Sequence, residues 1–172
     1  MNKFVDRMIR AAKLDVNLYE EVEADKSALR QSMSVLILSS VAAGIGVIGK
    51  GGIIGLLGGI IAALVGWLIW SYITYIIGTK LLPSQHTRAD YGELLRTIGF
   101  SSSPGLIRIL EVIPGLTGIV RIVANIWMLV TMVIAVRQAL DYTSTLRAVG
   151  VCIIGAVIQI IVFSIFYGLI GA

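Results

Sequence analysis

The segment from Gly99 to Val136 reads GFSSSPGLIRILEVIPGLTGIVRIVANIWMLVTMVIAV. It is hydrophobic enough to lie in a bilayer, yet it contains two prolines and the charged residues Arg108 and Glu111. Ionisable groups at membrane depth are costly and usually face protein or water. The segment therefore indicates a membrane protein whose bundle includes something other than a simple lipid-facing helix.

The composition of the whole chain supports this interpretation. Hydrophobic residues make up 57% of the 172 residues, charged residues only 14%, and the mean hydropathy is +0.92. A soluble domain of this size could not bury so much apolar surface, so the bilayer must act as the solvent. We predict an all-α integral membrane bundle of about five transmembrane helices with an amphipathic helix at its N-terminus.

The same composition argues against several other classes of protein. There is no dense basic face with base-reading side chains, so no nucleic-acid partner is expected. Cys152 is the only cysteine, which excludes an intrachain disulfide and a cysteine-type metal site. We expect no catalytic residues, no metal and no cofactor.

The chain divides into two regions. Residues 1–31 form a charged cytoplasmic arm, and residues 32–172 form a transmembrane domain. The predicted spans are residues 32–49, 53–78, 93–113, 119–136 and 148–171. Three residues separate the first two spans, which predicts a tight antiparallel hairpin.

The arm begins with an amphipathic pattern over residues 2–14. Phe4, Val5, Met8, Ile9 and Ala12 share one helical face, and the basic residues lie mostly around the other. Such a helix either lies on an anionic membrane surface or packs on the cytoplasmic end of its own bundle. Residues 15–25 are acidic and are expected to stand off the lipid.

Residues 98–117 allow two interpretations. Ser103 could cap a short helix that starts at Pro104 and covers half the bilayer. Alternatively, a helix begins near Glu93, kinks at Pro104 and crosses fully over about 31 Å. In both cases Pro114 and Gly115 end it. A crossing places eleven Lys and Arg residues on the cytoplasmic side and at most three outside, so we prefer the kinked crossing. We therefore expect a multi-pass protein of the cell membrane, with the N-terminus cytoplasmic and the C-terminus outside.

Several short motifs, in this order and spacing, resemble the Ypt/Rab-GTPase-interacting-protein (YIP) family, in particular its prokaryotic branch. The motifs are Leu18-Tyr19-Glu20-Glu21-Val22-Glu23, Tyr91-Gly92-Glu93-Leu94-Leu95-Arg96, Gly99-Phe100-x-x-x-Pro104, Val112-Ile113-Pro114-Gly115-Leu116, a Trp127-containing span and Arg137-x-Ala139-Leu140. The resemblance implies five spans and a cytoplasmic N-terminus, and its eukaryotic members are trafficking factors that associate with Rab GTPases. This chain lacks their Asp-Leu-Tyr-Gly-Pro signature and has only a short arm, which argues against a Rab-type GTPase partner.

Two constellations are candidates for functional sites. Gly51, Gly55, Gly59 and Ala63 recur every four residues and would let helices approach closely, within the chain by default or between two copies. Arg108 and Glu111 share a helix face and could form a polar intramembrane site with Asn125 and Gln159. The simpler interpretation of the charged pair is a structural ion pair near the membrane interface, and we favour it.

We therefore expect a non-enzymatic membrane organiser or adaptor. It would act through helix–helix contacts and through the charged arm and the polar loop 79–97. Membrane lipid, a second copy or other membrane proteins are the expected partners. The alternative is a small transporter or channel with its polar site around Arg108 and Glu111.

Overall fold

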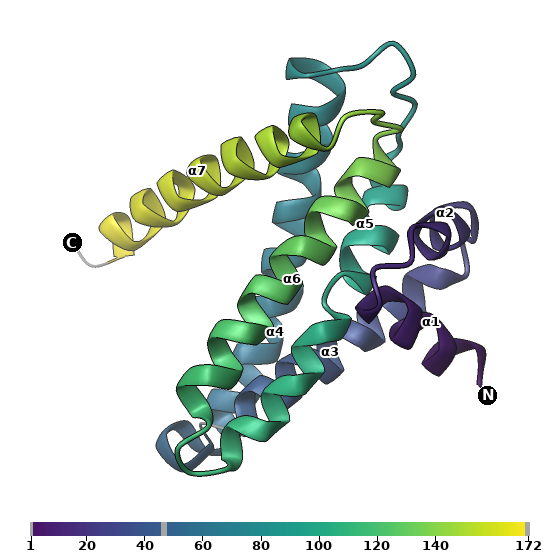
Figure 1. Cartoon of the computed structure of the whole chain (residues 1–172). Helices are drawn as coiled ribbons and strands as arrows, with labels where there is room; N and C mark the ends of the chain where they lie inside the picture. The colour runs from purple at the N-terminus through teal and green to yellow at the C-terminus, as the bar shows by residue number, and fades with distance from the viewer. Residues whose placement is uncertain (1, 46–47, 171–172) are drawn as a thin grey trace.

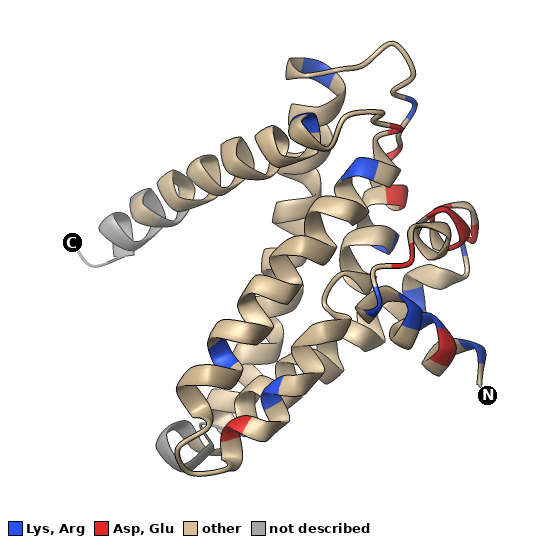
Figure 2. Ribbon diagram, in the orientation of Figure 1, with Lys and Arg blue, Asp and Glu red and all other residues tan. Residues whose placement is uncertain are grey.

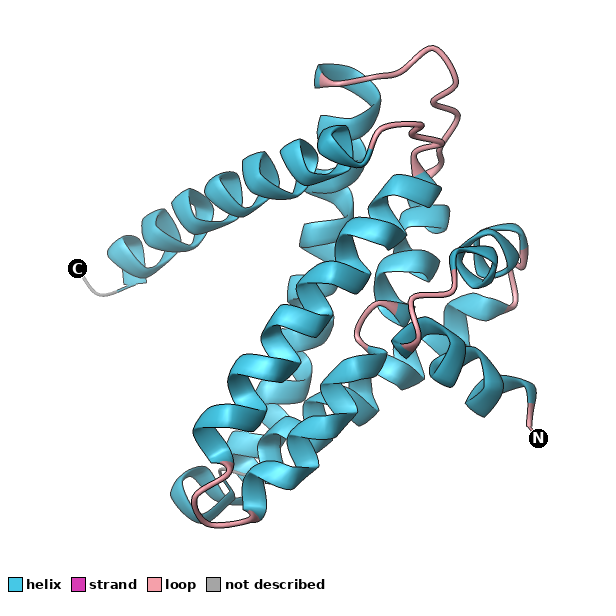
Figure 3. Ribbon diagram, viewed as in Figure 1, coloured by secondary structure: helices cyan, strands magenta, loops and turns pink. Residues whose placement is uncertain are grey.

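The computed structural model describes residues 2–45 and 48–170, the side chains of 48–51, 163 and 165–170 excepted. In this part of the chain every regular element is helical, which confirms the predicted fold class (Figure 3). The elements are α1 (Lys3–Ala12), α2 (Val16–Ala24), α3 (Ala28–Ile45), α4 (Ile48–Ile76), η1 (Ile77–Leu81), α5 (Tyr91–Phe100), η2 (Ser103–Val112), α6 (Thr117–Ala139) and α7 (Thr145–Ile170).

Four of these helices are long and apolar enough to cross a membrane. They are Ala28–Ile45, Gly52–Leu81, Thr117–Ala139 and the described part of α7, Thr145–Val162. Their limits differ by a few residues from the expected spans. The backbone of Gly52 has φ 58° and ψ −162° and interrupts the helical geometry within α4. A positive φ of this kind is readily adopted only by glycine.

The third predicted span is not one α-helix. α5 ends at Phe100, and a 3-10 helix, η2, begins at Ser103. The predicted continuous helix kinked at Pro104 is therefore wrong, and so is the predicted cap, because the Ser103 hydroxyl donates to the Phe100 carbonyl at 2.7 Å. Buried hydroxyls satisfy carbonyls at the break, where a continuous helix would have used backbone N–H groups. The predicted stop at Pro114 and Gly115 is confirmed, since η2 ends at Val112 and Gly115 has φ 87°.

The helices form a bundle in which η2 and α6 lie side by side (Figure 1). α3 packs against α4, α5 and η2, so it lies at the centre of the contacts. α7 packs through its first turns on α4, η1 and α6, and then extends away from the bundle (Figure 1). The described C-terminal half of α7 therefore exposes apolar side chains on several faces.

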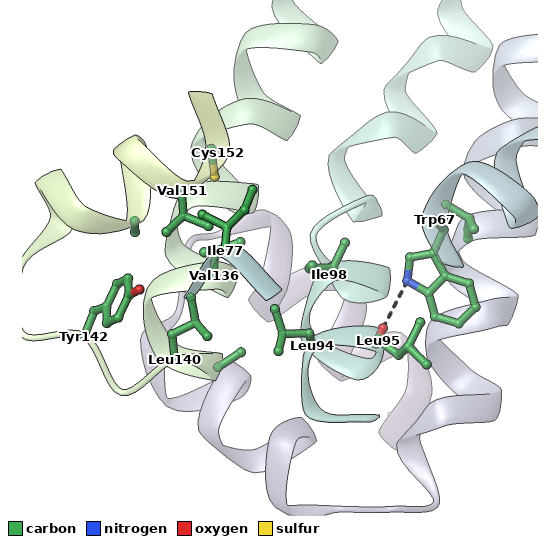
Figure 4. Close-up of a cluster of buried hydrophobic side chains, with 13 residues drawn as sticks. Trp67, Ile77, Leu94, Leu95, Ile98, Val136, Leu140, Tyr142, Val151 and Cys152 are labelled. Atoms are coloured by element: carbon green, nitrogen blue, oxygen red, sulfur yellow. Dashed lines mark hydrogen bonds between the residues drawn. The ribbon is translucent and has the colours of Figure 1, made fainter. Parts of the chain in front are cut away.

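The largest hydrophobic cluster joins α4, α5, α6 and α7 (Figure 4). Leu94, Val136 and Leu140 are fully buried in it. The indole Nε1 of Trp67 donates to the Leu95 carbonyl at 3.1 Å, so this large ring is both buried and satisfied. The cluster fixes α5 between α4 and α6.

Charged residues gather at the two ends of the bundle and leave its middle uncharged (Figure 2). Along α6, Arg121 and Arg137 enclose an uncharged stretch of about 24 Å. This length is close to the hydrocarbon thickness of about 30 Å, with the rest bridged by arginine side chains that reach toward the headgroups. The distribution is typical of a bundle that spans a bilayer.

Candidate functional site

The charges of the predicted intramembrane site form a cluster of three residues. The Nε of Arg108 donates to one carboxylate oxygen of Glu111 at 2.9 Å, and an Nη of Arg121 donates to the other at 2.9 Å. The Glu111 side chain is fully buried, whereas those of Arg108 and Arg121 are 26% and 46% exposed. This arginine clasp (Arg108, Glu111 and Arg121) ties η2 to α6 across the turn at Gly115.

The other two residues of the predicted site lie elsewhere. Asn125 and Gln159 line a cavity of about 480 Å³ together with aromatic residues of α4, Trp67 and Trp70. Arg108 lines a different cavity, of about 400 Å³. The structure therefore brings together Arg108 and Glu111, adds Arg121, and does not bring Asn125 and Gln159 into that cluster.

Arg121 is a residue whose part in the cluster the sequence did not reveal. It lies ten positions after Glu111, which is too far for a contact within one helix. The turn at Pro114 and Gly115 was the sequence signal for this contact. It reverses the chain and brings the start of α6, with Arg121, back toward the end of η2. Two arginines on one carboxylate stabilise the buried charge of Glu111. This arrangement agrees with the interpretation of Arg108 and Glu111 as a structural ion pair.

The small-residue stripe lies on an open face of α4. A Cβ built on Gly55 or Gly59 would meet no atom within 4 Å, and both residues are exposed. Together with Ala63 they line the 400 Å³ cavity rather than a helix contact within the chain. The surroundings of Gly51 lie outside the described residues.

The arm folds back onto the bundle. Arg7 is 1% exposed and donates to Glu21 (2.9 Å), Asp25 (2.7 Å) and Gln31 (2.9 Å), while Arg10 donates to Asp15 (2.7 Å) and Glu21 (2.6 Å). These bonds join the basic face of α1 to the acidic α2. They hold the pKa values of Asp25 and Glu21 below their usual range, with the Ser27 hydroxyl contributing first at Asp25 and Arg10 first at Glu21.

Two further contacts dock the arm on the membrane helices. The Trp127 indole donates to the Ala12 carbonyl at 2.8 Å. The buried Arg96 of α5 donates to the carbonyls of Val22 and Glu23 at the end of α2. Of the two interpretations of the first helix, the structure supports packing on the bundle, and the acidic residues are used to hold it there.

The docked arm and the loops beside it enclose a polar cavity of about 490 Å³. Its lining is Glu20, Glu23, Ala24, Glu93, Arg137, Gln138, Asp141, Tyr142 and Thr143. We name it the acidic cavity because four carboxylates face one arginine. Burial raises the pKa of Glu23 to about 7, and the negative charges of Glu93, Asp141 and Glu20 add to the effect. In the described residues, no group of three or more His, Cys, Asp or Glu side chains is suited to hold a metal ion.

The raised pKa of Glu23 predicts a pH-dependent stability. The folded protein holds a proton on Glu23 up to pH about 7, whereas the unfolded chain loses it near pH 4.5. Stability is therefore lost as the pH rises between these values. We expect Glu23→Gln to stabilise the protein by about 1 kcal/mol at pH 8, after allowance for solvent screening, and by little at pH 5.

Thermal unfolding in detergent between pH 5 and 8 measures this effect. Asp6→Asn, at an exposed carboxylate of α1, is the control and should leave the pH profile unchanged. If Glu23→Gln raised the stability by the same amount at pH 5 and at pH 8, the prediction would be contradicted.

The helices, the two charged ends and the apolar middle together define a multi-pass, all-helical membrane protein. A family model for the Yip1 domain matches residues 19–166, and the chain therefore belongs to the Yip1 domain family. This confirms the resemblance drawn from the sequence motifs. The family consists generally of non-enzymatic membrane-trafficking proteins. Neither the curated proteins nor the solved structures give a significant match.

Proposed function

We propose that this protein is a non-enzymatic organiser of the cell membrane, with its N-terminus in the cytoplasm. It acts through helix–helix contacts in the bilayer and through the surface formed by the docked arm and the loop before α5. The orientation rests on the excess of Lys and Arg at the arm end of the bundle.

The observation that carries the proposal is the docking of the arm. Arg7 of α1 binds Glu21 and Asp25 and also Gln31 of α3, and Arg96 of α5 binds the end of α2, so that α1 and α2 are both tied to the bundle. The acidic cavity is consequently presented in a fixed shape, and a partner that binds it does not have to pay the entropy of ordering a loose tail. A partner with basic side chains fits this cavity, because Glu20, Glu93 and Asp141 outnumber its single arginine, Arg137.

A second contact surface lies on α7. Ile153, Val157 and Ile160 are between 52% and 65% exposed, on a helix that extends away from the bundle. In a bilayer this surface is available to another membrane helix, which would pack on it by shape rather than by a hydrophobic driving force.

A photocrosslinking amino acid at Ala24 tests the proposal in living cells. Ala24 is exposed and lines the acidic cavity, and we expect protein adducts from this position. Reversing Glu20 and Glu93 to lysine should lower their yield at least tenfold. The control position is Ile54, which is 86% exposed on α4 and should give lipid adducts. Protein adducts that persist unchanged after charge reversal would contradict a role for the cavity.

Transport is the second candidate, and one observation favours it. The cavity that Asn125 and Gln159 line is formed by residues of α3, α4, α5, α6 and α7, so it places two side-chain amides among the membrane helices. The clasp around Glu111 opposes it, because a carboxylate fixed by two arginines is poorly placed to exchange ions or protons. Solute flux in proteoliposomes that is abolished by Glu111→Gln would overturn the organiser proposal.

A further inference from the structure

The groove that begins at the arginine clasp has a shape and charge that point to a ligand. Its lining comes from α3, α4, η2 and α6 and includes Ser39, Gly55, Gly59, Arg108 and Met128. Apart from Arg108 and the two α3 serines, Ser39 and Ser40, the lining is made of glycine, alanine and leucine residues and one methionine. We propose that this groove binds one anionic phospholipid, with its phosphate at Arg108 and an acyl chain along Gly55 and Gly59.

The charge balance of the arginine clasp supports the proposal that the headgroup of the bound lipid is anionic. Two arginines share the single carboxylate of Glu111, which leaves one positive charge unbalanced. Among the described residues, Glu111 is the only acidic group paired with either arginine. Arg108 uses its Nε for Glu111, and its two Nη groups make no hydrogen bond to the residues that the structure describes, so they can donate to a phosphate. An excess positive charge at the membrane boundary attracts anionic lipid, and a lipid phosphate would neutralise it.

The glycines of α4 support the proposed position of the acyl chain. The space beside Gly55 and Gly59 is open, and the groove is floored by α3. The neighbouring cavity with Trp67 and Met132 shares Leu36, Ala63 and Met128 with this groove, so apolar lining continues toward the middle of the bundle. A chain of methylenes follows such a path without leaving any polar group unpaired.

A second copy of the protein fits the groove less well. A helix about 10 Å across needs roughly 400 Å³ for each turn, so the groove would hold about one turn. Copies related by a two-fold axis also present the same surface to each other, and a contact at this groove would bring two unbalanced arginine clusters together. Like charges at such a contact repel.

Lipid retention in mild detergent tests the proposal. Native mass spectrometry of the purified full chain, titrated with phosphatidylglycerol or phosphatidylcholine, measures the bound lipid. We expect one phosphatidylglycerol per chain, retained at least tenfold more tightly than phosphatidylcholine. Arg108→Gln should remove this preference, and Gly59→Leu should abolish retention by filling the groove.

Gly58→Leu is the matched control for the filled groove. Gly58 is exposed on the same helix, a Cβ there also meets no atom within 4 Å, and it does not line the groove. It should retain lipid as the unmodified chain does. Equal retention of both lipids, retention unaffected by Gly59→Leu, or a dimer that dissociates on Gly59→Leu would each overturn the proposal. Because Gly59 faces open space, its replacement remains informative if Arg108→Gln fails to fold.

Discussion

Replacing Gly99 by alanine is expected to destabilise the bundle by about 2–3 kcal/mol. A Cβ at Gly99 would lie 2.4 Å from the Cβ of Ser32 and 3.2 Å from the Ser32 backbone carbon. Neither atom belongs to the far end of a flexible side chain, so α3 and α5 would have to move apart. The loss would exceed the roughly 1 kcal/mol that alanine gains over glycine in a helix.

Gly58→Ala is the control for this prediction. Gly58 is also helical, but a Cβ there would meet no atom within 4 Å, so only the helix-propensity gain remains. Unfolding of both variants in mixed micelles, followed by circular dichroism, gives the comparison. If Gly99→Ala were as stable as Gly58→Ala, the close approach of α3 and α5 described here would be wrong.

Arg7→Ala is expected to detach the arm from the bundle. The substitution removes three side-chain bonds and leaves Glu21 and Asp25 without their buried counter-charge. Removing one partner of a buried ion pair costs about 3–5 kcal/mol; we expect about 3 here, because Glu21 and Asp25 are partly exposed. Such a loss raises the fraction of open arm by about two orders of magnitude, which limited proteolysis of residues 1–31 would detect as faster cleavage.

Lys3→Ala serves as the comparison for the arm. Lys3 also faces Asp25, but at 3.8 Å and with 67% of its side chain exposed. Exposed pairs of this kind contribute little, so its proteolysis rate should match that of the unmodified protein. Equal cleavage of the Arg7→Ala and Lys3→Ala variants would show that the Arg7 bonds do not hold the arm.

The architecture could be predicted from the sequence because membrane helices follow from apolar length alone. The same was true of the turn at Pro114 and Gly115, whose residue types permit few other conformations. The break after Phe100 could not be predicted, because Pro104 is compatible with a kink as well as with a new helix. Just after the break, Gly105 packs closely against Ser39 and Met128, a tertiary contact that no local pattern reveals.

Only the part of the candidate site that depends on local spacing could be predicted from the sequence. Arg108 and Glu111 lie three residues apart, so their contact follows from helical periodicity. Arg121 joins them only through the turn, and Asn125 and Gln159 are separated from them by the packing of whole helices. The basic residues of the first helix were expected on the face opposite its apolar residues, but the sequence did not show that α2 folds back and buries one of them, Arg7.

The winding of η2 has a consequence for how the protein matches its membrane. Ten residues of 3-10 helix extend about 20 Å, whereas the same ten residues as α-helix would extend about 15 Å. With the ten residues of α5, at about 15 Å, the two helices have a summed length of about 35 Å, which is comparable to a hydrocarbon core of about 30 Å. The tighter coil thus adds about 5 Å to the length of η2, nearly the pitch of one α-helical turn.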